Sequence, residues 1–242
     1  MTEPALAVEG LSAWYGAAQI LFDLSFRVAS GEVVALMGRN GAGKTTTLRA
    51  VMGLMAQRSG RVRFLGEDIS RLKPFEIARR GVGYVPEDRR IFSDLTVLEN
   101  LDIGRQPARH HRAQATAPAW TPERLFRIFP NLGAMPDRRG ASMSGGEQQM
   151  LTVARTLMGN PLLVLLDEPS EGVAPVIVEE MADTVIELKK AGLSVLLSEQ
   201  NINFAEIVCD RVYVLEKGQI EWTGPMADLA GNIDVQRRLL SV

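Results

Sequence analysis

A glycine-rich turn lies near the start of the chain, between a short apolar run (residues 32–37) and a helical pattern (residues 45–54). It reads Gly-Arg-Asn-Gly-Ala-Gly-Lys-Thr over residues 38–45 and matches G-x-x-x-x-G-K-[ST]. Glycines let the backbone wrap closely around phosphates, and the following helix adds its positive amino end. Lys44 can reach the terminal phosphates, and the Thr45 hydroxyl can ligate Mg²⁺. The sequence therefore predicts an α/β unit that binds a nucleotide.

The rest of the chain alternates between strand and helix patterns. Apolar runs at residues 162–166 and 193–198 predict buried strands, and residues 175–191 between them predict a helix. This alternation indicates a mostly parallel, buried sheet. Further strands are expected at residues 6–15, 19–28, 61–65 and 83–85, with a hairpin at 211–215 and 219–223. Further helices are expected at residues 96–103, 122–129, 145–159, 201–209, 225–230 and 234–240.

The middle of the chain, residues 87–160, is mostly helical in pattern and is expected to form a subdomain inserted between two halves of an α/β core, residues 1–86 and 161–242. Residues 105–122 differ in composition, with three prolines and the adjacent His110 and His111. Such composition predicts a loop. Adjacent histidines on a loop rarely converge on one ion, so a solvated loop is favoured over a metal site.

Charge and cysteine content narrow the possible functions. The 242 residues include 27 Lys+Arg and 29 Asp+Glu, for a net charge of −2, whereas chains that grip DNA through its backbone are usually basic. Nucleic acid is therefore not an expected partner. A single cysteine, Cys209, excludes an intrachain disulfide and fits a reducing compartment. No apolar run approaches the roughly 20 residues that span a bilayer, and no signal pattern is seen, so we expect a cytoplasmic chain that reaches a membrane only through partners.

Two carboxylates end the apolar run at residues 162–166 abruptly. Asp167 and Glu168 would lie at the carboxyl edge of the sheet, beside the phosphate-binding turn. Asp167 suits a Mg²⁺ or Mg²⁺-water contact. Glu168 suits the base that orients or deprotonates the attacking water.

A second anion-binding motif is Met-Ser-Gly-Gly-Glu-Gln-Gln at residues 143–149. Ser144, Gly145 and Gly146 open a helix, and its amino end is a further potential phosphate site. Two separate phosphate sites on one chain make sense when two chains face each other and each completes the other's site.

In this order, the phosphate-binding turn, Ser-Gly-Gly-Glu-Gln and Leu-Leu-Asp-Glu-Pro resemble the ATP-binding subunit of an ABC transporter over nearly the whole chain. The resemblance implies a single cassette of the P-loop NTPase fold class α/β, with a mostly parallel central sheet, N-terminal antiparallel strands and an inserted helical subdomain. It implies an ATPase with ATP and Mg²⁺ as cofactors. Two such subunits form a head-to-tail dimer whose closure drives transmembrane permease subunits.

The resemblance also assigns residues. Tyr15 matches the aromatic residue that stacks on adenine, and Lys44 and Glu168 keep the roles given above. Ser144, Gly145, Gly146 and Glu147 form the signature motif that meets the opposite chain's ATP. The phosphates and Mg²⁺ are cradled by Gly38, Arg39, Asn40, Gly41, Ala42, Gly43, Lys44, Thr45 and Thr46.

Four positions depart from the family's common pattern. Met143 replaces the usual leading Leu of the signature motif, an apolar exchange that changes little. Glu87 stands where the family usually has a Gln that contacts Mg²⁺ and water and links to the permeases; a Glu could ligate Mg²⁺ but adds negative charge. Ala174 stands where an Asp is common. Gln200 replaces the usual switch histidine; it can hydrogen-bond a γ-phosphate but cannot titrate near neutral pH.

These departures together resemble one branch, the smaller ATP-binding subunit of bacterial branched-chain amino-acid importers. Such a subunit works with a second, non-identical ATP-binding subunit, two permeases and, indirectly, a periplasmic binding protein, on the inner face of the cell membrane. Close relatives in that branch import urea, amides or other small organic solutes. The surface between Glu87 and Asn100 is expected to dock on a permease. A soluble ABC ATPase without a membrane partner is the distant alternative, disfavoured by the single cassette and the absence of a heptad run.

Overall fold

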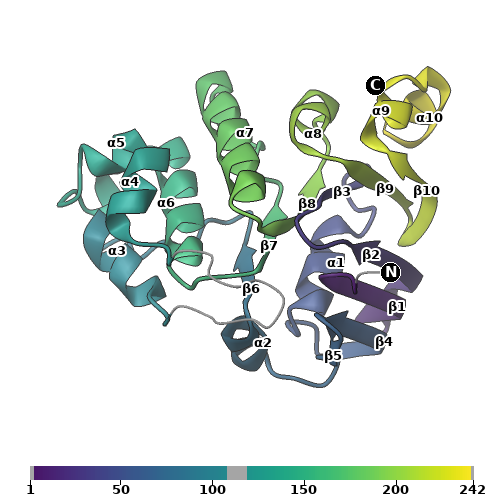
Figure 1. Cartoon of the computed structure of the whole chain (residues 1–242). Coiled ribbons are helices and arrows are strands. Elements are labelled where there is room, and N and C mark those ends of the chain that lie inside the picture. Colours follow the sequence, from purple (N-terminus) through teal and green to yellow (C-terminus); the bar gives the residue numbers. More distant parts are fainter. Residues whose placement is uncertain (1–2, 108–118, 241–242) are drawn as a thin grey trace.

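A six-stranded sheet forms the centre of the computed structural model, which describes residues 3–107 and 119–240 (Figure 1). Its strand order is β10-β9-β3-β8-β7-β6, and all neighbours are parallel except β10 and β9. The strands are β3 (Val33–Met37), β6 (Val82–Val85), β7 (Leu163–Asp167), β8 (Ser194–Glu199), β9 (Arg211–Glu216) and β10 (Gln219–Pro225). The predicted mostly parallel sheet and the C-terminal hairpin are confirmed.

A separate antiparallel sheet is built from the N-terminal part, in the order β2-β1-β4-β5. Its strands are β1 (Leu6–Tyr15), β2 (Ala18–Val28), β4 (Gln57–Phe64) and β5 (Glu67–Asp68). β4 begins four residues before the predicted start at residue 61. Its first half is polar and largely exposed because it pairs with β1 but packs little apolar surface, so hydrophobic periodicity does not mark it.

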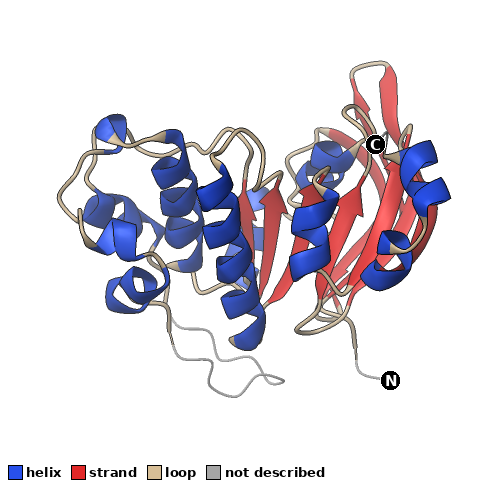
Figure 2. Cartoon of the chain, turned by 90° about the horizontal axis from the view of Figure 1, so that it is seen from above, coloured by secondary structure: helices blue, strands red, loops and turns tan. Residues whose placement is uncertain are grey.

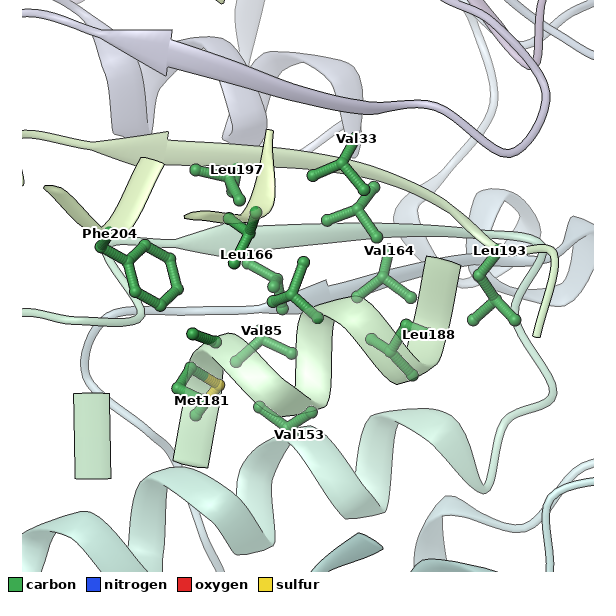
Figure 3. Close-up of a cluster of buried hydrophobic side chains, with 14 of the residues drawn as sticks. Val33, Val85, Val153, Val164, Leu166, Met181, Leu188, Leu193, Leu197 and Phe204 are labelled. Carbon is green, nitrogen blue, oxygen red and sulfur yellow. The ribbon is translucent and has the colours of Figure 1, made fainter. Parts of the chain in front are cut away.

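Alternation along β3 divides the apolar core between the two faces of the central sheet. Val34 and Leu36 point into a cluster shared with the antiparallel sheet and helix α1 (Lys44–Val51). Val33 and Ala35 point into the other cluster, which is covered by helices α7 (Pro175–Lys190) and α8 (Ile202–Val208). Figure 3 shows Leu166, Val164 and Val33 of this second cluster above Met181 and Leu188 of α7. Because both faces are covered, the strands read as continuous apolar runs.

The middle of the chain forms a group of helices beside the sheets (Figure 2). They are α3 (Val97–Gly104), α4 (Pro122–Ile128), α5 (Pro130–Gly133) and α6 (Gly145–Leu157), with a short 3-10 turn at Gly140–Ser142. Thr96 and Glu99 form a capping box at the start of α3. The chain ends in α9 (Met226–Ala230) and α10 (Ile233–Leu239).

Several expectations are revised by short-range geometry. The helix expected at residues 45–54 ends at Val51 because Gly53 adopts a left-handed backbone. Helix α2 (Pro74–Arg80) was not predicted, since Ile77 is its only buried residue and gives no periodic signal. The expected loop at residues 105–122 lies mostly outside the described residues, and His110 and His111 with it. Among the helices that are described, none is long and apolar enough to cross a membrane.

Candidate functional site

The glycine-rich turn follows β3 directly and leads into α1. Gly38, Gly41 and Gly43 all have positive φ angles. A side chain at Gly38 could not be accommodated, because its Cβ would lie 2.4 Å from the Leu215 carbonyl oxygen of the adjacent strand. Gly43, at φ 107°, is the residue before the helix. The turn therefore needs glycine for both backbone conformation and close packing.

A cavity of about 460 Å³ opens beside this turn and gathers most of the predicted nucleotide residues from four separate parts of the chain. The predicted nucleotide and Mg²⁺ residues that do not line it are Gly38, Arg39, Ala42 and Asp167. The Arg39 guanidinium instead donates to the Arg238 carbonyl oxygen at 3.2 Å. Ile20 and Glu171 line it without having been predicted. The lining residues are Tyr15, Ile20, Asn40, Gly41, Gly43, Lys44, Thr45, Thr46, Glu87, Glu168 and Glu171.

The Lys44 ammonium is the central cation of this cavity. It lies 3.0 Å from the Glu168 carboxylate and donates to the carbonyl oxygens of Gly38 at 2.9 Å and Arg39 at 3.3 Å. Both charged side chains are almost fully buried, with 4% of Lys44 and 7% of Glu168 exposed. Each charge of a buried ion pair is destabilising when the opposite charge is removed. A phosphate that binds Lys44 therefore competes directly with Glu168 for the ammonium.

Asp167 is held by three hydroxyl groups. Thr45 and Ser198 donate to its Oδ1 at 2.9 and 2.7 Å, and Tyr84 donates to its Oδ2 at 2.9 Å. Burial, followed by the nearby Asp167 charge, raises the pKa of Tyr84, so this hydroxyl remains a donor. A carboxylate joined to the Thr45 hydroxyl is an oxygen-only donor set, which suits a hard divalent cation.

Tyr84 and Ser198 were missed by motif matching. Both lie near the carboxyl ends of strands, β6 and β8, that flank β7. Position at that edge was the available signal, since the ligands of open α/β sheets bind there.

Gln200 joins the turn to Glu168. Its side-chain amide donates to Asn40 Oδ1 at 2.7 Å and to Glu168 Oε2 at 3.3 Å. Glu168 itself has a left-handed backbone, φ 47°, and its N–H is bonded to both the carbonyl and the hydroxyl oxygen of Ser198. A left-handed glutamate is held only by surrounding bonds of this kind.

Glu87 enters the cavity on the loop after β6. Partial burial raises the pKa of its carboxyl, and the negative charges of Glu168 and Asp167 raise it further. Glu87, which stands where the family usually has Gln, therefore lies close enough to Glu168 and Asp167 for their charges to raise its pKa.

The Ser144 motif lies elsewhere. Ser144 is the exposed N-cap of α6; its hydroxyl accepts from the Glu147 N–H at 3.3 Å, and its own N–H donates to Glu147 Oε2 at 2.6 Å. None of Ser144, Gly145, Gly146 and Glu147 lines the nucleotide cavity. Figure 1 shows α6 on the far side of α7 from α1, the helix that carries Lys44.

A family model described as ABC transporter matches residues 21–171. This range contains all the residues that line the cavity except Tyr15 and Ile20. The chain belongs to the ABC transporter family. As an ABC ATPase it hydrolyses ATP, and it is the ATPase subunit of a transporter; cassettes of this family dimerise and work with transmembrane permeases.

Relatives and solved structures agree with this membership. The high-affinity branched-chain amino acid transport ATP-binding protein BraG of Pseudomonas aeruginosa is 42% identical over 89% of this chain and 90% of its own length. The lipopolysaccharide export system ATP-binding protein LptB of Haemophilus influenzae is 36% identical over 96% of this chain and 95% of its own. A nucleotide-free ATP-binding cassette of an ABC transporter superposes with a TM-score of 0.80 and 28% identity, covering 96% of this ABC ATPase and 97% of that chain.

Proposed function

We propose that this ABC ATPase energises the import of branched-chain amino acids. The observation that carries the proposal is the 42% identity with the branched-chain amino acid transport protein across 89% of the chain. Relatives named for lipopolysaccharide export are 36% identical or less. The lower identity ranks export second, and import of urea, amides or another small organic solute keeps the same ATPase role. A soluble ATPase without a membrane partner is the least supported alternative.

Nucleotide binding is assigned to the cavity. The exposed half of the Tyr15 ring stacks on adenine, and the hydroxyl end of the ring accepts a bond from Arg49 at 3.4 Å. The turn from Gly38 to Thr46 wraps the phosphates with backbone N–H groups. Lys44 binds the terminal phosphates, and it exchanges Glu168 for them because one ammonium cannot fully satisfy both.

Hydrolysis is assigned to Glu168. Once Lys44 pairs with phosphate, the Glu168 carboxylate is free to accept a hydrogen bond from a water molecule and to take its proton. Gln200 lies 3.3 Å from Glu168 Oε2 and 2.7 Å from Asn40, so its amide can orient both the base and the turn. Because an amide does not titrate near neutral pH, Glu168 alone acts as the base.

Thr45 and Asp167 are proposed to hold Mg²⁺, together with Glu87, which also lines the cavity. Their oxygen donors fit this ion. The chemistry that Mg²⁺ supplies when bound is positive charge beside the phosphate oxygens. Ser198 and Tyr84 orient Asp167 toward Thr45 through the two bonds described above.

A second subunit is proposed to complete the site. The amino end of α6 presents Ser144, Gly145 and Gly146 to the surface, away from its own cavity. In a head-to-tail dimer, this end meets the ATP held by the other chain, which is either a second copy or a related ATP-binding subunit. Residues 87–160, which include α3, α4, α5 and α6, act as the subdomain that carries this end.

Permease docking is proposed at a groove of about 430 Å³ between α2 and the helices α3 and α6. Exposed Phe75, Phe92 and Ile103 line it, which gives an apolar receptor a short distance along the chain from Glu87. Asn100, the expected limit of this surface, is fully buried and is not part of it. Through the permeases, the chain lies on the inner face of the cell membrane.

The test is co-purification from detergent-solubilised membranes. Tagged chain should bring down two permeases and a second ATP-binding subunit, and the binding protein encoded with them should bind leucine, isoleucine or valine. Phe92→Glu should abolish this capture, whereas Phe22→Glu, which introduces the same charge at an exposed phenylalanine on β2, should not. Binding of urea, an amide or a lipid in place of the amino acids would redirect the cargo, and capture of no membrane protein would favour the soluble alternative.

A further inference from the structure

Glu199 is a buried carboxylate with no assigned part in nucleotide binding. It is the last residue of β8, only 2% exposed, and does not line the nucleotide cavity. Its Oε1 accepts the Ser170 N–H at 3.0 Å. Its Oε2 accepts the N–H groups of Gln200 and Asn201 at 3.0 and 3.1 Å. One side chain thus binds the backbone of two separate turns.

Those two turns carry the groups proposed for hydrolysis. Ser170 lies two residues after Glu168, and Gln200 follows Glu199 directly. The strands that precede the turns, β7 and β8, are parallel neighbours, with Asp167 opposite Ser198. Ser198 fixes the backbone of Glu168 from this strand end, and Glu199 fixes the next part of the same turn. The strand end therefore holds the turn at two successive points.

A carboxylate is the side chain best suited to this arrangement. Three N–H donors converge on it, and ionised oxygens accept all three. The pKa of Glu199 is raised, because burial outweighs the three N–H bonds that favour the ionised carboxylate. An amide in the same place would turn its NH₂ group toward one of the two sets of N–H donors and lose that contact.

The side chain of Gln200 depends on such a fixed backbone. It is exposed, and a single NH₂ group donates to both Asn40 and Glu168. Small rotations of the backbone at residue 200 would carry this group out of reach of Glu168, since the existing distance is already 3.3 Å.

We propose that Glu199 is a positioning residue for ATP hydrolysis, which locks the turn after Glu168 to the turn that presents Gln200. This inference rests on the roles proposed above for Glu168 and Gln200. Glu199 does not line the cavity, so it would act through the two turns. It sets the distance between the base and the Gln200 amide, so its loss acts on the chemical step rather than on ATP binding.

The test compares Glu199→Gln with Glu32→Gln in the full chain. Glu32 is a matched control: its carboxylate accepts the Ala29 N–H at 2.7 Å and pairs with Arg211, but it lies before β3, at the opposite end of that strand from the turn. Glu199→Gln should lower kcat roughly ten- to a hundredfold, as losses of supporting hydrogen bonds do, with the KM for ATP changed less than about twofold. Glu32→Gln should leave both constants unchanged.

A double-mutant cycle with Gln200→Ala distinguishes the positioning role of Glu199 from a merely structural role. In the Gln200→Ala background, Glu199→Gln should lower kcat no further, because both changes remove the same alignment. Wild-type kcat in folded Glu199→Gln, or full additivity with Gln200→Ala, would overturn the inference. If Glu199→Gln does not fold, Glu199→Asp keeps the charge but is one methylene group too short to reach both turns, and it should also lower kcat.

The proposed roles themselves are tested in parallel. If Glu168→Gln and Gln200→Ala hydrolyse ATP at the normal rate, those roles fail. If both are impaired while Glu199→Gln is normal, only the positioning role of Glu199 fails.

Discussion

The cavity at the turn before α1 and the amino end of α6 both carry glycine-rich motifs, but they differ in burial and in bonding. In the cavity, Lys44, Asp167 and Glu168 are buried and bonded across several strand ends. At α6, Ser144 is exposed, and its hydroxyl is bonded only to the first turn of its own helix. The first is a preorganised site with its charges fixed in place. The second is open to the surface, which fits the proposal that the anion is held by another chain.

Lys44→Ala should have the largest effect. It should disable nucleotide binding at the cavity and leave the α6 motif intact. Turnover of ATP, measured as phosphate release, should be abolished because the cation for the terminal phosphates is removed. The buried Glu168 is also left without its partner, at a cost of about 3–5 kcal/mol of stability. Lys190→Ala, which removes an exposed lysine paired with Glu187, is the control and should change neither quantity. Unchanged turnover in Lys44→Ala would refute the assignment of the turn.

Glu168→Gln should remove the base while leaving binding at both motifs. Turnover is expected to fall roughly a hundred- to ten-thousandfold. Size-exclusion chromatography with ATP should show a long-lived dimer, because ATP is clamped and not consumed. Glu206→Gln, at an exposed glutamate of α8 outside the cavity, makes the same exchange and should leave turnover near normal. A normal rate in Glu168→Gln places the base elsewhere.

Ser144→Asp should disable the motif at the amino end of α6 and leave the turn before α1 intact. Asp is a preferred N-cap, so α6 stays stable, but its charge repels the partner's phosphates. Turnover and ATP-dependent dimerisation should fall roughly a hundredfold, as for like charges across an interface. ATP affinity of the isolated chain should not change.

Thr96→Asp, at the equivalent capping box of α3, controls for the substitution itself. A dimer mixed from Ser144→Asp and Lys44→Ala chains tests whether the two motifs act across the interface. One of the two composite sites then has an intact turn and an intact α6 end. Partial recovery of turnover supports the head-to-tail arrangement, and no recovery together with normal mixed dimers contradicts independent composite sites.

Tyr15→Ala should weaken nucleotide binding moderately. Stacking of a base on an aromatic ring contributes about 1–3 kcal/mol, so the Kd for ATP should rise roughly tenfold. Tyr15→Phe keeps the ring and should bind normally. Equilibrium dialysis with ATP measures both, and equal affinities of the two variants would leave Tyr15 as a strand residue only.

Glu87→Gln should have the smallest effect. Because the folded state raises the pKa of Glu87, the ionised carboxylate is disfavoured by folding. At acidic pH, below its ordinary pKa, the group is protonated in both states and the variant should match the wild type. As pH rises through that value, the wild type loses stability relative to Glu87→Gln, by up to about 0.5 kcal/mol since the site is largely exposed. Thermal unfolding at pH 4 and pH 8 measures the difference, and no pH-dependent gain would contradict the repulsion from Glu168 and Asp167.

Motifs with fixed local spacing were predicted well. The turn before α1 and the acidic pair at the end of β7 were both read directly from neighbouring residues. Short elements with little buried surface, such as α2 and β5, were not. Their formation depends on contacts with other segments, and a single buried residue leaves no periodic trace.

A glycine-rich turn and its lysine can be recognised from residue type and spacing, because eight neighbouring positions suffice to form them. Which side chains meet around that turn depends on the packing of the whole chain. The pairing of Lys44 with Glu168, the three hydroxyl groups on Asp167 and the two turns joined by Glu199 link residues far apart in the chain. The physical reason is that parallel strands bring their carboxyl ends to one edge, and the order of those strands follows from packing the whole core.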